Sequence, residues 1–258
     1  MTDPILLDLI LQPGGLRVMF QPIFAIDPQA PGLFGVECLI RGPDGTDAEH
    51  PDAMFEYVRR HRAEPVTDRA CVAAILAEAG RLPSVPRVSF NVHAATLGRD
   101  VGFAAFILNR AMAARINPTR LILEIVEHAP PLDVPSFHTA LDALREAEVT
   151  IALDDVGLGQ SNYKMILDVR PQIYKLDRYL VTKAWNDSYR QVILDSLAKM
   201  ISRLDARAVA EGVEDIQELI AVQAAGIELV QGFLLSNPLS SADLRSSGFL
   251  NGYRPPTG

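Results

Sequence analysis

Short apolar stretches rich in β-branched residues alternate with helix-like patterns along nearly the whole chain, and this alternation limits the fold more than any other feature. We expect eight of the stretches to be strands, at residues 17–24, 34–40, 87–92, 121–126, 150–155, 172–176, 207–210 and 228–233. Apolar residues at helical spacing predict helices at residues 67–79, 102–115, 136–148, 187–204 and 215–225. Strands and helices that alternate over 258 residues predict an α/β barrel, and the alternative is an open doubly wound sheet.

The first connection does not fit a regular barrel. Only residues 25–33 separate the first two expected strands, and they include Pro28, Pro31 and Gly32. A parallel crossover needs roughly a dozen residues or more. We therefore expect the first strand to run antiparallel to the second.

Charge and composition exclude several classes of protein. The chain carries 24 Lys and Arg against 32 Asp and Glu, a net charge of -8, which argues against a nucleic acid polymer as partner because phosphate neutralisation needs a basic face. The two cysteines, Cys38 and Cys71, are too few for a secreted disulfide framework and are expected in the core. The sequence has no basic signal-peptide start and no apolar run of the roughly 18 residues that a membrane span requires. We expect a soluble, cytoplasmic protein with no membrane partner.

Polar residues interrupt the apolar strands at one recurrent place, at or near their carboxyl ends. These residues are Glu37, Asn91, Glu124, Asp154, Asp155, Lys175, Glu211 and Gln231. The carboxyl ends of barrel strands converge on one mouth, so the side chains are expected to meet there. Burying clustered carboxylates is costly unless protons or cations neutralise them, and one lysine cannot balance five carboxylates.

The ligand chemistry indicates which cations fit. Carboxylate and amide oxygens, without a Cys/His cluster, select Mg²⁺, Mn²⁺ or Ca²⁺. The adjacent pair Asp154 and Asp155 suggests two ions that share one carboxylate, the arrangement that activates water in phosphodiester hydrolysis. Taken singly, these residues have ordinary explanations: Glu37 could pair with Arg41, Glu211 could pair with Lys175, and the Asp pair could cap a helix. Their recurrence at equivalent strand positions favours a site.

Seven blocks in a fixed order resemble the EAL phosphodiesterase domain, which cleaves the bacterial second messenger cyclic di-GMP. The first block resembles the family signature Glu-Ala-Leu-Leu-Arg, and the similarity extends from Phe20-Gln21-Pro22-Ile23 to Asn237-Pro238-Leu239. The blocks are Glu37-Cys38-Leu39-Ile40-Arg41, Phe90-Asn91-Val92, Leu123-Glu124-Ile125-Val126-Glu127, Ile151-Ala152-Leu153-Asp154-Asp155, Lys175-Leu176-Asp177-Arg178, Ala210-Glu211-Gly212-Val213-Glu214 and Val230-Gln231-Gly232-Phe233.

The resemblance implies a modified TIM (β/α)8 barrel whose first strand is antiparallel to the rest. It implies one such domain at residues 1–250, followed by a tail at 251–258 whose composition suggests flexibility. The implied reaction is hydrolysis of cyclic di-GMP to linear 5′-pGpG with two Mg²⁺ or Mn²⁺ ions, and we expect Ca²⁺ to inhibit because its looser geometry positions water poorly. A homodimer is also implied. Whether the chain is a stand-alone enzyme or an excised domain stays open.

The resemblance also assigns roles to residues of this chain. The implied ligands of the first metal are Glu37, Asn91, Glu124 and Asp154, and those of the second are Asp154 and Asp155, with Glu211 through water. Lys175 would contact the attacking water or the scissile phosphate, so the catalytic set is Lys175, Glu211 and Asp155. The implied substrate-binding residues are Gln21, Arg41 and Gln231, and the supporting residues are Glu127, Asp177 and Glu214.

The chain departs from the family pattern at three places. Cys38 replaces the small Ala of the signature, and its side chain should face away from Glu37. His93 stands where Ser is common, and we expect it to pack or to hydrogen-bond rather than to bind metal. The loop from Val156 to Asn162 differs in three side chains, which leaves a weak or inactive cyclic di-GMP receptor, or a protein-interaction module, as alternatives. Nothing in the composition identifies the guanine-binding residues, although loops at 41–51 and 93–100 are candidates.

Overall fold

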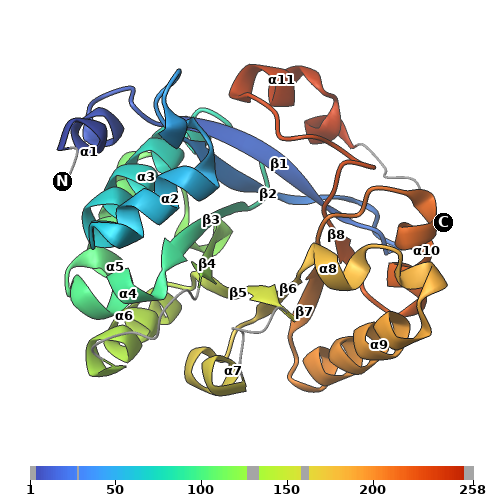
Figure 1. The fold of residues 1–258 in the computed structure, drawn as a ribbon. Coiled ribbons are helices and arrows are strands. Elements are labelled where there is room, and N and C mark those ends of the chain that lie inside the picture. Colours follow the sequence, from blue (N-terminus) through green and yellow to red (C-terminus); the bar gives the residue numbers. More distant parts are fainter. Residues whose placement is uncertain (1–3, 28, 127–133, 158–162, 253–258) are drawn as a thin grey trace.

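The computed structural model describes residues 4–27, 29–126, 134–157 and 163–252. Eight strands close into a barrel in sequence order, with helices around the outside (Figure 1). The strands are β1 (Arg17–Ala25), β2 (Gly32–Arg41), β3 (Val88–His93), β4 (Leu121–Val126), β5 (Thr150–Val156), β6 (Ile173–Leu176), β7 (Arg207–Ala210) and β8 (Leu229–Val230). Because the sheet is closed, the alternative fold, an open doubly wound sheet, is excluded.

Strand β1 runs antiparallel to both of its neighbours. It pairs with β2 from Arg17 opposite Arg41 to Ala25 opposite Gly32, and with β8 through Phe24 opposite Val230. The other neighbouring pairs, from β2 with β3 to β7 with β8, are parallel. The prediction of a modified TIM-type barrel with an antiparallel first strand is therefore confirmed.

The described helices include the five that the sequence predicts and several shorter ones. They are α1 (Pro4–Leu11), α2 (Pro51–Arg60), α3 (Glu64–Ala79), α4 (Ala94–Arg99), α5 (Phe103–Ala113), α6 (Val134–Glu146), α7 (Tyr163–Val169), α8 (Arg178–Val181), α9 (Ser188–Arg203), α10 (Ile216–Ala224) and α11 (Ser241–Ser246). Short 3-10 helices lie at Asp47–Glu49, Pro118–Arg120, Ala184–Asn186 and Phe249–Asn251. The prediction of a loop at 93–100 was wrong, because α4 fills most of it and buries Thr96 and Leu97.

The predicted last strand, 228–233, was too long. After Val230 the backbone leaves the ladder and bonds to the loop after β7: the Val213 amide donates to the Gln231 carbonyl (3.1 Å), and the Leu234 amide donates to the Val213 carbonyl (3.0 Å). Gly232 permits this approach, because a Cβ at that position would lie 2.1 Å from the Val213 carbonyl oxygen. The predicted tail, 251–258, lies almost wholly outside the described residues and stays a prediction.

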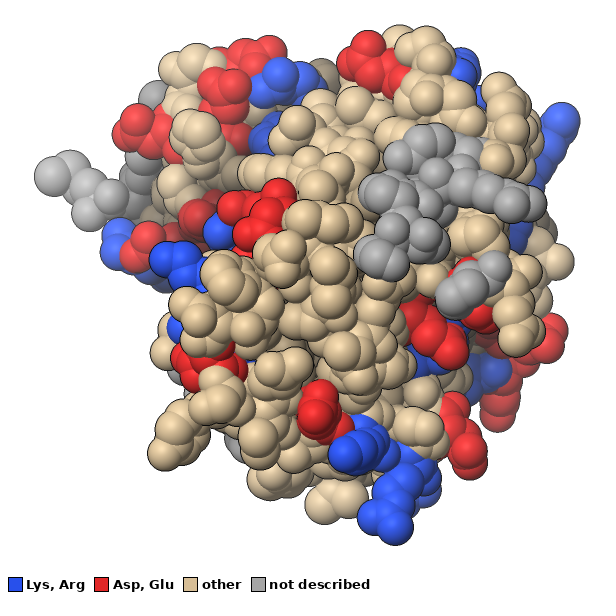
Figure 2. Space-filling view, turned by 90° about the vertical axis from the view of Figure 1, so that its right-hand side faces the viewer, with Lys and Arg blue, Asp and Glu red and all other residues tan. Residues whose placement is uncertain are grey.

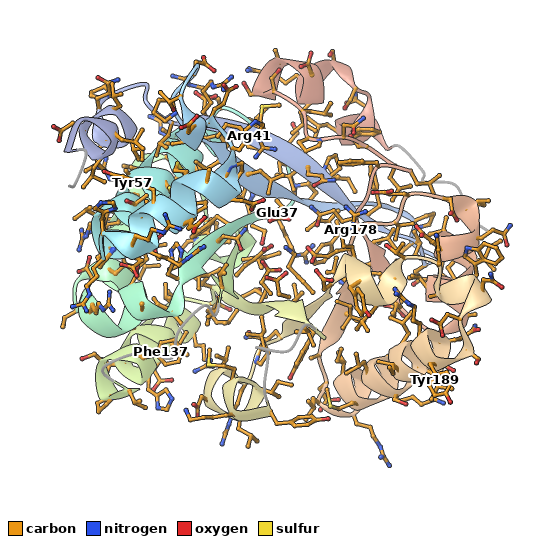
Figure 3. The ribbon with its side chains drawn as sticks, viewed as in Figure 1. Glu37, Arg41, Tyr57, Phe137, Arg178 and Tyr189 are labelled. Atoms are coloured by element: carbon orange, nitrogen blue, oxygen red, sulfur yellow. The ribbon has the colours of Figure 1, made fainter. Side chains whose placement is uncertain are left out.

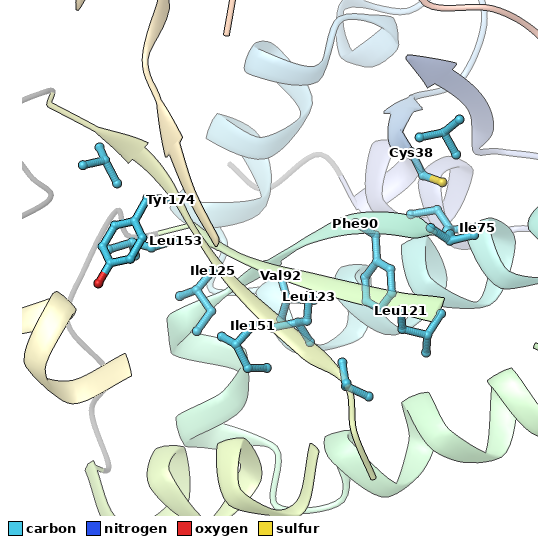
Figure 4. Close-up of a cluster of buried hydrophobic side chains, with 14 of the residues drawn as sticks. Cys38, Ile75, Phe90, Val92, Leu121, Leu123, Ile125, Ile151, Leu153 and Tyr174 are labelled. Atoms are coloured by element: carbon cyan, nitrogen blue, oxygen red, sulfur yellow. The ribbon is translucent and has the colours of Figure 1, made fainter. Parts of the chain in front are cut away.

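The outer core lies between the barrel and its helices. Side chains at alternate strand positions, among them Phe90, Leu123 and Leu153, point outward and pack against helical residues such as Ile75 (Figure 4). Cys38 and Cys71 are both buried in this layer, as predicted. The outer core thus uses one of the two faces of each strand, and the other face points into the barrel.

The inner face of the barrel is apolar at its amino-terminal end. A separate cluster fills this end and consists of Ile23, Phe34, Ile122, Ala152, Ile173, Val209 and Leu229. The guanidinium carbons of Arg87 and Arg207 lie 4.5 and 4.8 Å from the centroid of the Phe34 ring. Because side chains fill this end of the barrel interior, the space that the described residues leave inside the barrel lies at the opposite end.

Surface charge is mixed on the face that carries the C-terminal elements. Figure 2 shows acidic and basic side chains interspersed there, separated by a broad uncharged area. None of the described helices has the length and apolar character needed to cross a membrane.

The packing predicts a contrast between two leucines. Leu123→Ala should lower the free energy of unfolding by about 2–5 kcal/mol, because the side chain is fully buried in the outer core and its removal leaves a cavity. Leu167 on α7 is 71% exposed, so Leu167→Ala should change it by about 0.5 kcal/mol or less. Urea titrations of both variants test this, and equal losses would contradict the assignment of the outer core.

Candidate active site and metal centre

The candidate site is a polar layer on the inner face of the barrel, two residues beyond the apolar cluster along the chain from β4 to β8. Glu124 follows Ile122, Asp154 follows Ala152, and Lys175 follows Ile173 at this spacing. Glu211 and Gln231 follow Val209 and Leu229 in the same way, directly after β7 and β8. Because strand side chains alternate between faces, a spacing of two keeps the polar groups inside the barrel and above the apolar plug.

Lys175 lies at the centre of this layer and is 2% exposed. Its ammonium nitrogen is 2.6 Å from a Glu124 oxygen, 2.7 Å from Glu211, and 3.1 Å from both Glu37 and Asp154. These four carboxylates belong to segments that are far apart in the chain. The structure therefore brings the predicted ligands together, although Glu37 pairs with Lys175 rather than with Arg41.

Side-chain amides complete the layer. The Asn91 amide donates to one Glu37 oxygen (2.9 Å), and the Gln231 amide donates to the other (2.8 Å). The Gln231 amide also donates to the Gln21 side-chain oxygen (3.1 Å). Ser89, which sequence analysis missed, donates to Glu124. The signal for Ser89 was its position two residues before Asn91, on the same face of β3.

Burial and mutual repulsion control the protonation of the carboxylates. Burial and then the charge of Glu37 raise the pKa of Glu124 to about 8. Burial also raises the pKa values of Asp154 and Glu211, even though the charge of Lys175 opposes it. Burial tends to raise the pKa of Glu37. The charge of Lys175 and the hydrogen bonds from Gln231, Lys175 and Asn91 outweigh this effect, so the pKa of Glu37 is lowered. One ammonium group is therefore insufficient to keep all four carboxylates charged.

A β-bulge lets Asp154 and Asp155 both reach the mouth. Adjacent strand residues normally face opposite sides, yet both carboxylates line the same cavity. The pairing of β5 with β6 shifts between Leu153 and Val156, and Asp155 has a φ of +53°, in the left-handed region. This extra residue turns Asp155 toward the mouth and returns Val156 to the outer core.

The donor set fits hard divalent cations. One oxygen each of Asp154, Asp155 and Glu211 lie within 4.8 Å of one another. The side-chain oxygen of Asn91 is buried and accepts no hydrogen bond from any described residue, which leaves it available as a ligand. Burial raises the pKa of Asp155 to about 6, and the charges of Asp154 and Asp177 add to the shift. A divalent cation relieves this repulsion, and carboxylate and amide oxygens are the ligands that Mg²⁺ and Mn²⁺ prefer.

Two adjoining cavities open at this end of the barrel. The first, which we call the mouth cavity, has a volume of about 280 Å³ and is lined by Gln21, Glu37, Asp154, Asp155, Lys175, Glu211 and Gln231, among others. Arg178 of α8 and Glu37 of β2, both of which line it, are labelled in Figure 3. The second, which we call the α2 cavity, has a volume of about 400 Å³ and contains Arg41 in its wall. Leu39 and Asp154 line both cavities, so the two adjoin each other at these residues.

The remaining predicted residues lie in the wall of the mouth cavity or outside the described residues. Asp177 caps α8 by accepting a hydrogen bond from the Tyr179 amide (2.6 Å), and Glu214 pairs with Arg178 (3.1 Å). Glu127 and residues 158–162 of the altered loop lie outside the described residues. His93 hydrogen-bonds to Asp68, with its Nδ1 2.9 Å from a carboxylate oxygen, as expected for a structural histidine.

The sequence matches the model of the EAL domain over residues 6–238, so the chain belongs to the EAL domain family. Its relatives include the Escherichia coli cyclic di-GMP phosphodiesterase PdeL, which is 26% identical over 92% of this chain and 66% of its own length. The E. coli blue light- and temperature-regulated antirepressor BluF is 27% identical over 84% of this chain and 53% of its own length. The chain thus spans between about half and two thirds of the length of these two relatives.

Solved structures show the same fold. Klebsiella pneumoniae BlrP1 in complex with manganese and cyclic di-GMP is 28% identical and superimposes with a TM-score of 0.75, covering 89% of this chain and 57% of its own. A calcium complex of BlrP1 with cyclic di-GMP is 27% identical, with a TM-score of 0.75 over 87% of this chain and 56% of its own. EAL structures therefore bind divalent metals together with cyclic di-GMP.

The arrangement around Lys175 predicts a stability effect that depends on metal. In the presence of a chelator, Lys175→Met should lower the free energy of unfolding by about 3–5 kcal/mol, because two buried and two partly buried carboxylates lose their common cation. Added Mn²⁺ should recover part of this loss, since it takes over the neutralisation.

Lys164 provides the matched control. Its pair with Asp168 lies at the surface, with the Lys164 side chain 64% exposed, so Lys164→Met should change the free energy of unfolding by about 1 kcal/mol or less. Urea denaturation with chelator and with Mn²⁺ measures both variants. A loss for Lys175→Met that is the same in both conditions would contradict a metal site in this layer.

Proposed function

We propose that the protein is a metal-dependent phosphodiesterase that hydrolyses cyclic di-GMP to linear 5′-pGpG. The observation that carries this proposal is the convergence of five carboxylates, Asn91 and Lys175 in one inward-facing layer. Membership of the EAL family supports it, because PdeL is a cyclic di-GMP phosphodiesterase and BlrP1 binds cyclic di-GMP with metal.

The proposed metal ligands come from four strands, β2 to β5, and from the residue directly after β7. Glu37, Asn91, Glu124 and Asp154 would hold one Mg²⁺ or Mn²⁺ ion, and Asp154 and Asp155 would hold the second, with Glu211 bound through water. Such ions lower the pKa of a bound water and stabilise the leaving oxygen of a phosphodiester. This assignment is supported by the proximity of the Asp154, Asp155 and Glu211 oxygens and by the available oxygen of Asn91.

Other residues of the chain position the reacting groups. Lys175 donates to the attacking water or to a phosphate oxygen, since its ammonium lies among the ligands. Gln231 fixes the Glu37 carboxylate and Gln21 through its two hydrogen bonds. Arg41, at the carboxyl end of β2, offers a forked and permanently charged donor to a second phosphate group. Glu211 is placed to accept the proton that the attacking water loses.

A second candidate is a receptor that binds cyclic di-GMP without cleaving it. BluF, a relative of comparable identity, is an antirepressor by name, so membership of the family does not by itself imply turnover. Binding of cyclic di-GMP with no metal-dependent product would favour this candidate. The predicted homodimer and cytoplasmic location stay predictions for either function.

The proposed activity predicts loss of turnover when a ligand is removed. Glu37→Gln should reduce the rate of pGpG formation by a factor of about 100 or more, because the metal loses a carboxylate and the amide cannot replace its charge. The matched control is Glu146→Gln, at an exposed position on α6, which should leave the rate unchanged. Chromatography of the products measures both rates. An active Glu37→Gln variant, or a wild-type chain without product in Mg²⁺ and Mn²⁺, would reject the proposal.

The choice of metal gives a further prediction. Turnover should cease with a chelator, return with Mg²⁺ or Mn²⁺, and stay low when Ca²⁺ replaces them, because Ca²⁺ accepts a looser and more variable coordination. Cyclic di-GMP should still bind in Ca²⁺, as measured by calorimetry. Full turnover in Ca²⁺ alone would contradict the proposal that the reaction requires the stricter coordination geometry of Mg²⁺ or Mn²⁺.

A further inference from the structure

Strand β3 differs from the other strands at the level of the apolar plug. Each of the other seven contributes one apolar residue to the plug: Ile23, Phe34, Ile122, Ala152, Ile173, Val209 and Leu229. On β3, Phe90 and Val92 pack in the outer core (Figure 4), so Ser89 and Asn91, which alternate with them, face the interior. Ser89 is the Cα partner of Ile122 on β4, so a serine takes the plug position of this strand.

A buried hydroxyl at this position is unfavourable unless it is hydrogen-bonded. Ser89 is 1% exposed, and a buried hydroxyl without a partner lowers stability. Its oxygen donates toward two acceptors, the Ile122 carbonyl at 3.3 Å and Oε1 of Glu124. The hydroxyl has a single proton, and a carboxylate is a stronger acceptor than a carbonyl. The contact with Glu124 therefore explains why this position of the plug is polar.

The Glu124 carboxylate is held at both of its oxygens. Oε1 accepts from the Ser89 hydroxyl, and Oε2 accepts from the Lys175 ammonium (2.6 Å). Among the described residues these two are its hydrogen-bond donors, and at 1% exposure Glu124 has no solvent that could replace them. A carboxylate oxygen can accept more than one bond, so the two donors orient the group and still leave lone pairs for a cation.

Lys175 alone cannot fix this orientation. Its ammonium nitrogen also contacts the carboxylates of Glu37, Asp154 and Glu211. An ammonium group has three protons for these four carboxylates, and it turns freely about its carbon–nitrogen bond. Ser89, in contrast, lies on a strand that pairs with β2 on one side and β4 on the other, so the position of its hydroxyl is set by the barrel. The rigid contact of Glu124 is therefore the one with Ser89.

We propose that Ser89 is a positioning residue that holds the Glu124 carboxylate in the orientation needed to bind a divalent cation. This inference rests on the proposed function, because it takes Glu124 as a metal ligand. Glu37 offers a parallel, since the amides of Asn91 and Gln231 donate to its two oxygens. Groups that hydrogen-bond to metal ligands set the direction of those ligands, and their loss weakens metal binding even though they do not touch the ion.

The test titrates Mn²⁺ into the metal-free wild-type chain and into Ser89→Ala by calorimetry. Ser89→Ala removes one oxygen and should weaken Mn²⁺ binding roughly 10- to 100-fold, the usual effect of losing such a contact. Ser89→Thr keeps the hydroxyl and suits a strand, so it should stay within about threefold of wild type. The matched control is Ser196→Ala, at an exposed position on α9 where the hydroxyl donates to the Val192 carbonyl (2.6 Å), and its affinity should stay within about twofold.

A second measurement separates positioning from a loss of stability. If the chain cleaves cyclic di-GMP, Ser89→Ala should need roughly 10- to 100-fold more Mn²⁺ for half of its maximal rate, and it should approach the wild-type rate when Mn²⁺ is saturating. A variant that is merely less stable would lose rate at every Mn²⁺ concentration and would keep the midpoint.

The outcomes distinguish this inference from the proposed function. If wild type binds Mn²⁺ but forms no pGpG, the proposed function fails, and the calorimetric comparison still decides the role of Ser89. If wild type binds no Mn²⁺, both are rejected. If Ser89→Ala binds Mn²⁺ as tightly as wild type, only the role of Ser89 is overturned. An equal loss in Ser89→Thr and Ser89→Ala also overturns it, because the hydroxyl would then not be the cause.

Discussion

The site depends on the alternation of side chains along strands that close into a barrel. Each strand has one face against the helices and one toward the interior, so a shift of one residue would exchange core and site residues. The interior holds two layers: an apolar plug that includes Ile122 and Val209, and a polar layer that includes Glu124 and Glu211. The plug closes one end of the barrel to water, and the polar layer is thereby restricted to the other end.

Electrostatics explains why this polar layer suits metal chemistry. Lys175 contacts four carboxylates, yet burial still raises the pKa values of Glu124, Asp154 and Glu211. A layer with excess negative charge is unfavourable without further cations, and the same excess gives affinity for divalent ions. The lysine, held by its neighbours, also places one positive charge in the wall of the mouth cavity. Stability without metal and affinity for metal are therefore opposed properties of one set of side chains.

The sequence predicts the strands better than the connections, because the apolar pattern of a strand is regular and is contained within a few neighbouring residues. Residues 121–126 and 207–210 have the expected bounds, whereas α4 and α7 are short and lack a long apolar repeat. The polar layer could be predicted because its members recur at strand ends. The bulge at Asp155 could not, since its left-handed φ results from pairing with β6 and from the need to keep Val156 in the outer core. The α2 residues that line the α2 cavity could not be predicted either, because they depend on the rotation of the helix and therefore on how Met54 and Val58 pack.

The two cavities take their walls from different parts of the fold. The mouth cavity is built mainly from strand ends and the loops after β6, β7 and β8, which a closed barrel holds in fixed relation. The α2 cavity takes much of its wall from a helix in the long connection between β2 and β3. Substitutions at exposed positions of α2 should leave the barrel ladder intact, because the helix is anchored by the buried Met54 and Val58, with Phe55 and Tyr57 also packed against the core. The wall formed by α2 can therefore change without disturbing the barrel, whereas no carboxylate around Lys175 can change without affecting its neighbours.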